Sequence, residues 1–158
     1  MELGYKGEYV FGQETKIAFR FWLSAFSFLT TMTSIQSHKI LSYRDLVVWQ
    51  KSKDFVIRLY KITNSFPTDE KFGLTSQMRR SAVSIPSNIA EGRGRRSRKD
   101  FVQFLYMSVG SLCELETQIE IAKDLRFIKE VEYNDCVASL KEIGRMLASM
   151  IEKLKAGT

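Results

Sequence analysis

The sequence predicts an all-α protein, an up-down-up-down antiparallel four-helix bundle that occupies residues 42–158. Three observations lead to this fold. Apolar residues recur at spacings of three and four almost throughout the chain after Ser42. The segments that break this pattern are short, as in a bundle of sequential helices. No alternating strand pattern competes with the helical one, and a domain of this length can enclose a hydrophobic core.

The first helix is expected from about Tyr43 to Asn64. Phe66-Pro67 should terminate it, because a residue before proline avoids the helical region. Thr68 or Asp69 is expected to cap the next helix. One apolar face should carry Leu46, Trp49, Val56, Leu59 and Thr63, with Phe55 and Ile62 beside it.

The second helix is expected from about Glu70 to Glu91, followed by Gly92 as a left-handed residue that closes it. Pro86 removes one backbone hydrogen bond and should kink the helix. Asn88 follows Ser81 and Ser84 on an adjacent face, where small polar residues allow a neighbouring helix to approach, and carbonyls freed by the proline are its expected partners. The buried stripe should be Leu74, Met78, Ala82, Ile85 and Ile89.

Ser97 is expected to begin the third helix, with Asp100 as its capping-box partner, and the helix should end near Asp124. Its buried stripe should be Phe101, Phe104, Leu105, Ser108, Leu112, Leu115, Ile119 and Ala122. In the fourth helix, the expected stripe is Tyr133, Val137, Leu140, Gly144, Leu147, Ile151 and Leu154.

Both of these helices carry apolar residues beyond one face: Val102, Tyr106, Val109 and Cys113 on one, and Cys136, Ile143, Met146 and Met150 on the other. A monomeric bundle needs one apolar face per helix, so the wider coverage indicates either a subunit interface or one broad core.

Residues 1–41 are predicted to be an N-terminal extension outside the bundle. The apolar stretch from Ile17 to Leu29 is shorter than the about 20 residues that span a bilayer, and no signal-peptidase-like site follows it. Met32 offers an alternative start of translation. We therefore expect an appendage or an over-long reading frame rather than a secreted or membrane protein.

Enzymatic chemistry finds little support in the sequence. His38 is the only histidine and precedes the bundle, which excludes Ser-His-Asp triads, His-based zinc sites and Glu-x-x-His di-iron pairs within it. Cys113 and Cys136 have no metal-binding spacing and are expected to be free thiols in a reducing compartment. The sequence predicts a cytoplasmic protein that is not an enzyme and has no metal or cofactor.

Positive charge is concentrated in one part of the chain. Residues 38–100 carry a balance of +8, whereas residues 101–158 carry −2. Five cations occupy seven positions between the second and third helices: Arg93, Arg95, Arg96, Arg98 and Lys99, here called the basic turn. Arg79 and Arg80 add two more on the second helix. Such a density of arginine favours phosphate as the ligand, recognised by charge and shape rather than base sequence.

Three segments carry a family resemblance: YRDLVVWQKS (residues 43–52), SQMRRSAVSIPSNIAEGRGRRS (residues 76–97) and GSLCELETQ (residues 110–118). With these, the stretch from Ser42 to Leu154 resembles the four-helix-bundle proteins encoded in intervening sequences of bacterial 23S ribosomal RNA genes. The resemblance implies a homopentamer. It also implies kinship with the accessory variability protein of diversity-generating retroelements, a basic pentamer that binds nucleic acid and a reverse transcriptase. Pro86, Asn88, Glu91 and Gly92 belong to the motif, and structural roles are expected for them.

Two functions remain open. The first is an oligomeric protein that binds RNA or DNA through Arg79, Arg80 and the basic turn. The second is an interaction scaffold whose basic turn docks an acidic protein partner such as a polymerase. Arg79 is equally compatible with a structural ion pair.

Overall fold

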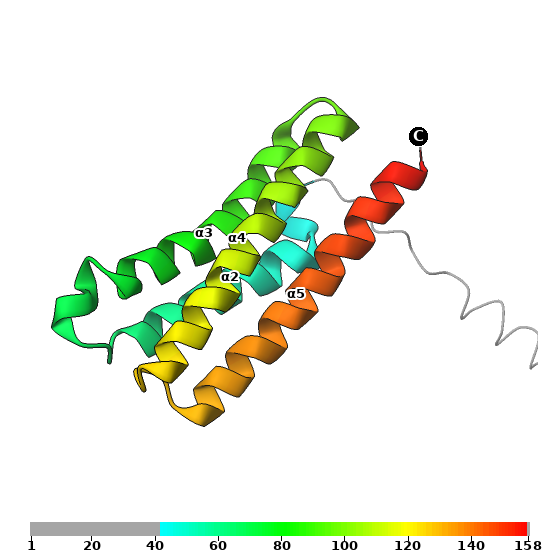
Figure 1. Ribbon diagram of the computed structural model, residues 1–158. Coiled ribbons are helices and arrows are strands. Elements are labelled where there is room, and N and C mark those ends of the chain that lie inside the picture. Colours follow the sequence, from blue (N-terminus) through cyan, green and yellow to red (C-terminus); the bar gives the residue numbers. More distant parts are fainter. Residues whose placement is uncertain (1–41, 158) are drawn as a thin grey trace, which may run out of the picture. The chain divides into compact units, whose positions relative to one another are not determined.

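The computed structural model describes residues 42–157, and within them every regular element is helical (Figure 1). This confirms the all-α class and the four long helices, whereas the predicted extension, residues 1–41, lies outside the described residues. The elements are the short 3-10 turn η1 (Tyr43–Asp45), α2 (Val47–Thr63), the 3-10 turn η2 (Thr68–Lys71), α3 (Leu74–Gly94), α4 (Arg98–Asp124) and α5 (Glu130–Ala156).

The four helices form a closed ring of neighbours, in which α2 packs on α3 and α5, and α4 packs on the same two helices. Each helix returns along the one before it (Figure 1), because the connecting segments are too short to cross the bundle. The start of α2, the end of α3, the start of α4 and the end of α5 consequently lie at one end of the bundle. This end contains the basic turn.

The predicted core face of α2 is confirmed at Leu59 and Thr63 and differs in its other positions. Trp49 and Val56 are only half-buried, whereas the fully enclosed positions are Val48, Ser52, Phe55, Leu59 and Thr63. Trp49 instead packs edge-on against Tyr43 of η1, with 5.1 Å between ring centroids. Ser52 and Thr63 are tolerated inside because their hydroxyls donate to backbone carbonyls one turn back, at 2.7 and 2.9 Å.

The start of α3 also differs from prediction. The chain first makes η2, and α3 begins only at Leu74. Neither Thr68 nor Asp69 caps it. The Glu70 carboxylate accepts a hydrogen bond from the Leu74 N–H group at 2.9 Å, because the extra 3-10 turn brings Glu70 back over the first turn of the helix. The predicted stripe of α3 is confirmed at Met78, Ala82, Ile85 and Ile89, with Leu74 half-buried.

Gly92 does not end α3 in a left-handed conformation. The helix continues to Gly94, and no glycine among the described residues has a positive φ. Gly92 is instead a point of close helix approach, since a β-carbon there would lie 2.5 Å from Phe104 Cβ and 2.9 Å from Phe101 Cδ2. The absent side chain lets α4 lie directly against α3.

The helix continues through Pro86, and the expected partnership of Asn88 with carbonyls near it is not observed. Asn88 is half-buried and borders a surface groove of α3. A different polar group, the hydroxyl of Ser108 on α4, is fully buried where α4 meets α3. This hydroxyl lies 3.1 Å from the carbonyl oxygen of Phe104 and 3.2 Å from that of Ile85 on α3. A serine is small enough to fit where the two helices meet.

Ser97 caps α4 as predicted, accepting a hydrogen bond from the Asp100 N–H at 3.0 Å, and the helix ends at Asp124. The return bond from the Ser97 N–H to the Asp100 carboxylate, which would complete the predicted capping box, does not form. The stripe of α5 is corrected in part: Cys136 and Ile143, expected outside the seam, are core residues at 3% and 1% exposure. Tyr133, Val137, Gly144 and Leu154 are half-buried instead. The core row of α5 is therefore Cys136, Leu140, Ile143, Leu147 and Ile151, at helical spacing.

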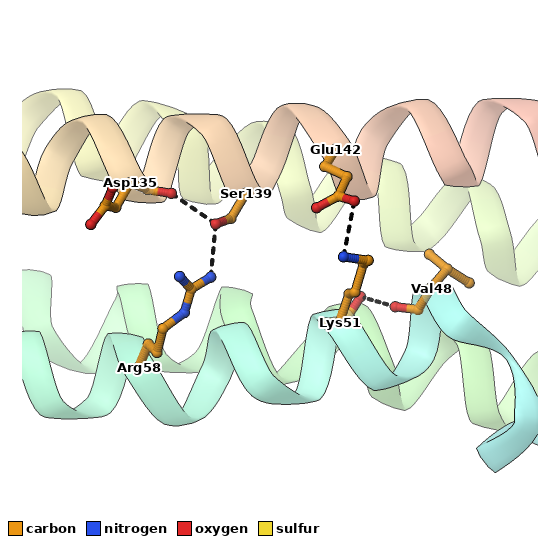
Figure 2. Close-up of polar contacts among 7 residues, drawn as sticks. Val48, Lys51, Arg58, Asp135, Ser139 and Glu142 are labelled. Atoms are coloured by element: carbon orange, nitrogen blue, oxygen red, sulfur yellow. Dashed lines mark hydrogen bonds and ion pairs between the residues drawn. The ribbon is translucent and has the colours of Figure 1, made fainter.

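Polar side chains bridge α2 and α5 along their exposed edge (Figure 2). Lys51 pairs with Glu142 at 2.9 Å, and Arg58 donates to the Ser139 hydroxyl at 2.7 Å. The Ser139 hydroxyl donates in turn to the Asp135 carbonyl on its own helix at 2.7 Å. These exposed contacts align the two helices and each adds little stability in water.

Candidate nucleic-acid interface

The basic turn lies where α3 passes into α4. All five of its cations, Arg93, Arg95, Arg96, Arg98 and Lys99, are exposed. The first lies in the last turn of α3, the next two belong to the three-residue link, and the last two begin α4. The N-terminal turn of α4 faces the same place, and the Ser97 cap leaves other N–H groups of that turn without helical partners. Helix N-termini favour anions for this reason.

Arg95 is held in place by two contacts. It pairs with Glu91 one turn back on α3, and its guanidinium carbon lies 4.9 Å from the ring centroid of Phe104 on α4. This ion pair is the contact that the Glu91 carboxylate makes at this motif position. The pair neutralises part of the positive field of the turn, because a carboxylate lies within the cluster.

Arg98 reaches across to the end of α5, where it donates to the Gly157 carbonyl. This contact brings the last turn of α5, with Lys153 and Lys155, to the same end of the bundle. A hydrogen bond with Tyr106 raises the pKa of the Lys155 ammonium above its ordinary value. Sequence reasoning missed these two lysines, although cations in the last turn of a helix are a recognisable signal.

Arg79 and Arg80 do not join the basic turn. Arg79 lies 14 positions before Arg93 on the same helix, which is about 21 Å along the axis. Its guanidinium donates to the Thr63 hydroxyl at 2.8 Å and to Asn64 Oδ1 at 2.9 Å, and lies over the Tyr60 ring at 4.6 Å. Arg79 thus joins α3 to the end of α2. Arg80 is exposed and bonds to Gln77 on its own helix at 2.7 Å.

The motif residues divide between the two regions. Pro86 is buried against the outer side of the helix pair, near Trp49, and Asn88 borders the groove that contains Arg79 and Arg80. Glu91 and Gly92 lie at the basic turn itself. Packing accounts for Gly92 and an ion pair for Glu91, whereas the structural roles expected of Pro86 and Asn88 stay predictions.

A hollow of about 400 Å³ opens at this end of the bundle. The arginines of the basic turn form its rim, and its floor is apolar, made by Leu46, Phe101, Met150 and Leu154. Two different helices, α4 and α5, and the segment before α2 contribute to the floor. No periodicity in the sequence pointed to this hollow, because it exists only where helix ends converge.

Within residues 42–157, no three His, Cys, Asp or Glu side chains gather in a way that would hold a metal ion. In the same part of the chain, no helix is both long and apolar enough to cross a bilayer.

The fold and the site define an all-helical bundle with a cationic turn at one end. A family model described as 23S rRNA-intervening sequence protein matches residues 44–149, and the chain belongs to this family. Among solved structures, it is similar to a protein of unknown function from the S23 ribosomal protein family of Bacteroides thetaiotaomicron VPI-5482. The two share 29% identity and a TM-score of 0.63, over 67% of this chain and 96% of the other. No curated protein matches the chain.

Proposed function

We propose that the protein is a non-enzymatic, cytoplasmic nucleic-acid-binding protein that contacts RNA or DNA phosphates through its basic turn. The observation that carries this proposal is the exposure of five cations on one short turn, of which Arg95 pairs with the Glu91 carboxylate. Arginine forks match phosphate oxygens in geometry, and the start of α4 adds backbone donors. Recognition is by charge and shape, because no element here is built to enter a groove and read bases.

We further propose that the chain assembles into a homopentamer, the number that the family resemblance implies. Large apolar side chains remain exposed on the described helices, among them Ile57, Tyr60, Phe72, Tyr106 and Val131. Burial of such residues between subunits would stabilise a ring. A ring presents several basic turns to one nucleic acid, so weak single contacts sum. Sedimentation velocity at micromolar concentration tests this: a species of five 18.3 kDa chains is expected, and a lone monomer would contradict it.

Binding is tested by fluorescence anisotropy of a labelled structured RNA and a DNA duplex, over a range of salt concentrations. The informative variant is Arg96→Ala with Lys99→Ala, because both side chains are exposed on the turn. Its matched control is Lys61→Ala with Lys141→Ala, which removes the same charge from exposed positions away from the turn.

The turn variant should bind weakly. The slope of log affinity against log salt concentration should be shallower by about 1.8, because each lost phosphate contact removes about 0.9 from it. The control should bind nearly as the parent does. If neither nucleic acid binds at low salt, the proposal fails, and docking of an acidic protein on the basic turn becomes the better explanation. Equal losses in the two variants would show that net charge, not the turn, drives binding.

A further inference from the structure

We propose that the hollow at the basic turn receives one unpaired nucleobase, whose flanking phosphate lies on the arginine rim. This inference rests on the proposed function and deepens it, because it names single-stranded or bulged nucleic acid as the preferred ligand. It assigns the apolar floor a role that phosphate contacts alone leave unexplained.

The dimensions and lining of the hollow suit such a ligand. Its volume of about 400 Å³ lies in the range of small-molecule sites, and a base with part of its sugar needs less. The floor offers the Phe101 ring and the side chains of Leu46, Met150 and Leu154. A nucleotide has the complementary construction, since its base faces are apolar and its phosphate is an anion. Charge complementarity with the rim thus selects the occupant.

The position of Phe101 is fixed rather than incidental. Gly92 lies directly beneath it, where an added β-carbon would approach Phe101 Cδ2 to 2.9 Å. The ring is therefore supported by the backbone of α3, and it lines the hollow together with Gly92. Proteins that hold single strands combine a cationic track with an aromatic ring on which bases stack, and such stacking tolerates any base.

A duplex cannot use this floor, because its bases are stacked and paired inside the helix. The inference consequently predicts a preference that a purely cationic surface does not produce. Binding to a blunt RNA duplex should be salt-dependent but weaker than binding to the same duplex with a short single-stranded overhang. Stacking of one base corresponds to a gain of roughly fivefold or more in affinity.

The test measures the affinity of the full chain for the blunt duplex and for the overhanging duplex by competition at the same salt concentration. It is done with the parent protein and two variants. Phe101→Leu keeps an apolar side chain against Gly92 but removes the ring. Phe127→Leu is the control, because Phe127 is also half-buried but packs on Phe66 beyond the other end of α4, with 5.6 Å between ring centroids. Phe101→Leu should abolish the preference for the overhang and leave duplex binding unchanged, and Phe127→Leu should retain the preference.

Crosslinking of the parent protein gives a readout that needs no variant to fold. An overhang carrying a photoreactive base should attach to Phe101, Met150 or Leu154. Attachment to other regions, or a preference that survives in Phe101→Leu, would overturn the assignment to this hollow. Equal, salt-dependent binding of blunt and overhanging duplexes would overturn this inference and leave the proposed function intact. Absence of any salt-dependent binding would overturn both.

Discussion

Gly92 and Phe104 are in such close apposition that a β-carbon on the glycine would lie 2.5 Å from that of the phenylalanine. The neighbouring atom is not the end of a flexible side chain, so it cannot move aside without moving α4. This contact fixes how closely α3 and α4 approach at the basic turn. It also connects the family motif to the floor of the hollow, since Phe101 rests on the same glycine.

Gly92→Ala should therefore destabilise the fold. Overpacking of this kind costs about 1–3 kcal/mol, only partly offset by the helix preference of alanine, about 1 kcal/mol. Thermal or urea unfolding followed by circular dichroism measures the difference. The control is Gly110→Ala in α4, where an added β-carbon meets nothing within 4 Å. That change should stabilise by about 0.5–1 kcal/mol. A stabilised Gly92→Ala protein would contradict the close-approach role.

Arg79→Ala should lower stability without weakening nucleic-acid binding. The guanidinium makes hydrogen bonds to Thr63 and Asn64 at the end of α2, and the loss is expected to be roughly 1–2 kcal/mol. Arg79→Lys should not restore it, because an ammonium cannot make both contacts from one planar group. Arg80→Ala is the matched control and should have little effect on unfolding, since Arg80 bonds only within its own exposed face. If Arg79→Ala bound nucleic acid more weakly while its free energy of unfolding was unchanged, Arg79 would belong to the nucleic-acid interface instead.

Glu91→Gln should tighten nucleic-acid binding and make it more sensitive to salt. The carboxylate pairs with Arg95 inside the basic turn, and its removal leaves one more positive charge available for phosphate. Anisotropy titrations at several salt concentrations measure the change. Asp69→Asn, at the opposite end of the bundle, removes the same charge from an exposed position and should change affinity less. Equal effects in both variants would assign the gain to net charge alone.

The two cysteines should differ sharply in reactivity. Cys113 is exposed, whereas burial raises the pKa of the Cys136 thiol from its ordinary value of 9.0 to about 11. With a disulfide reagent at neutral pH, one thiol should react quickly and the other only as the protein unfolds. Cys113→Ser should abolish the fast phase. Two fast thiols in the native protein would contradict the burial of Cys136.

Cys136 also predicts a pH dependence of stability. The unfolded chain releases this proton near pH 9, and the folded protein retains it until about pH 11. Its contribution to stability is therefore complete below pH 9 and is lost as the pH rises from 9 to 11. The difference in unfolding free energy between the parent and Cys136→Ala should narrow over this interval. A constant difference would show that the thiol does not titrate in this way.

Periodicity predicted the helices well and their exact faces less well. The predicted stripe of α3 is confirmed at Met78, Ala82, Ile85 and Ile89, which form one row of apolar side chains in the core. In α2 the prediction placed Trp49 on the core face because it is aromatic. The buried row of this helix includes Ser52 instead. A serine gives no apolar signal, and only its hydrogen bond to Val48 shows that the core accepts it.

The candidate site was predicted in the same uneven way. The basic turn is a local feature, so charge spacing alone located Arg93 to Lys99. Arg79 and Arg80 were grouped with it by charge, but helical rise separates them by about 21 Å and the end of α2 holds Arg79. Gly92 was assigned to a helix end because glycine often occurs there, whereas its contact with Phe104 comes from another helix.

The sequence by itself determined the all-helical class, the four helices with approximate ends, and the position of the cationic turn. These features follow from the spacing and composition of residues that are close together in the sequence. Only the tertiary structure decided which arginines share a surface, why Gly92 lacks a side chain, and that Leu46, Phe101, Met150 and Leu154 form one floor. Those relationships depend on the packing of distant segments, because side chains on different helices meet only after the bundle closes.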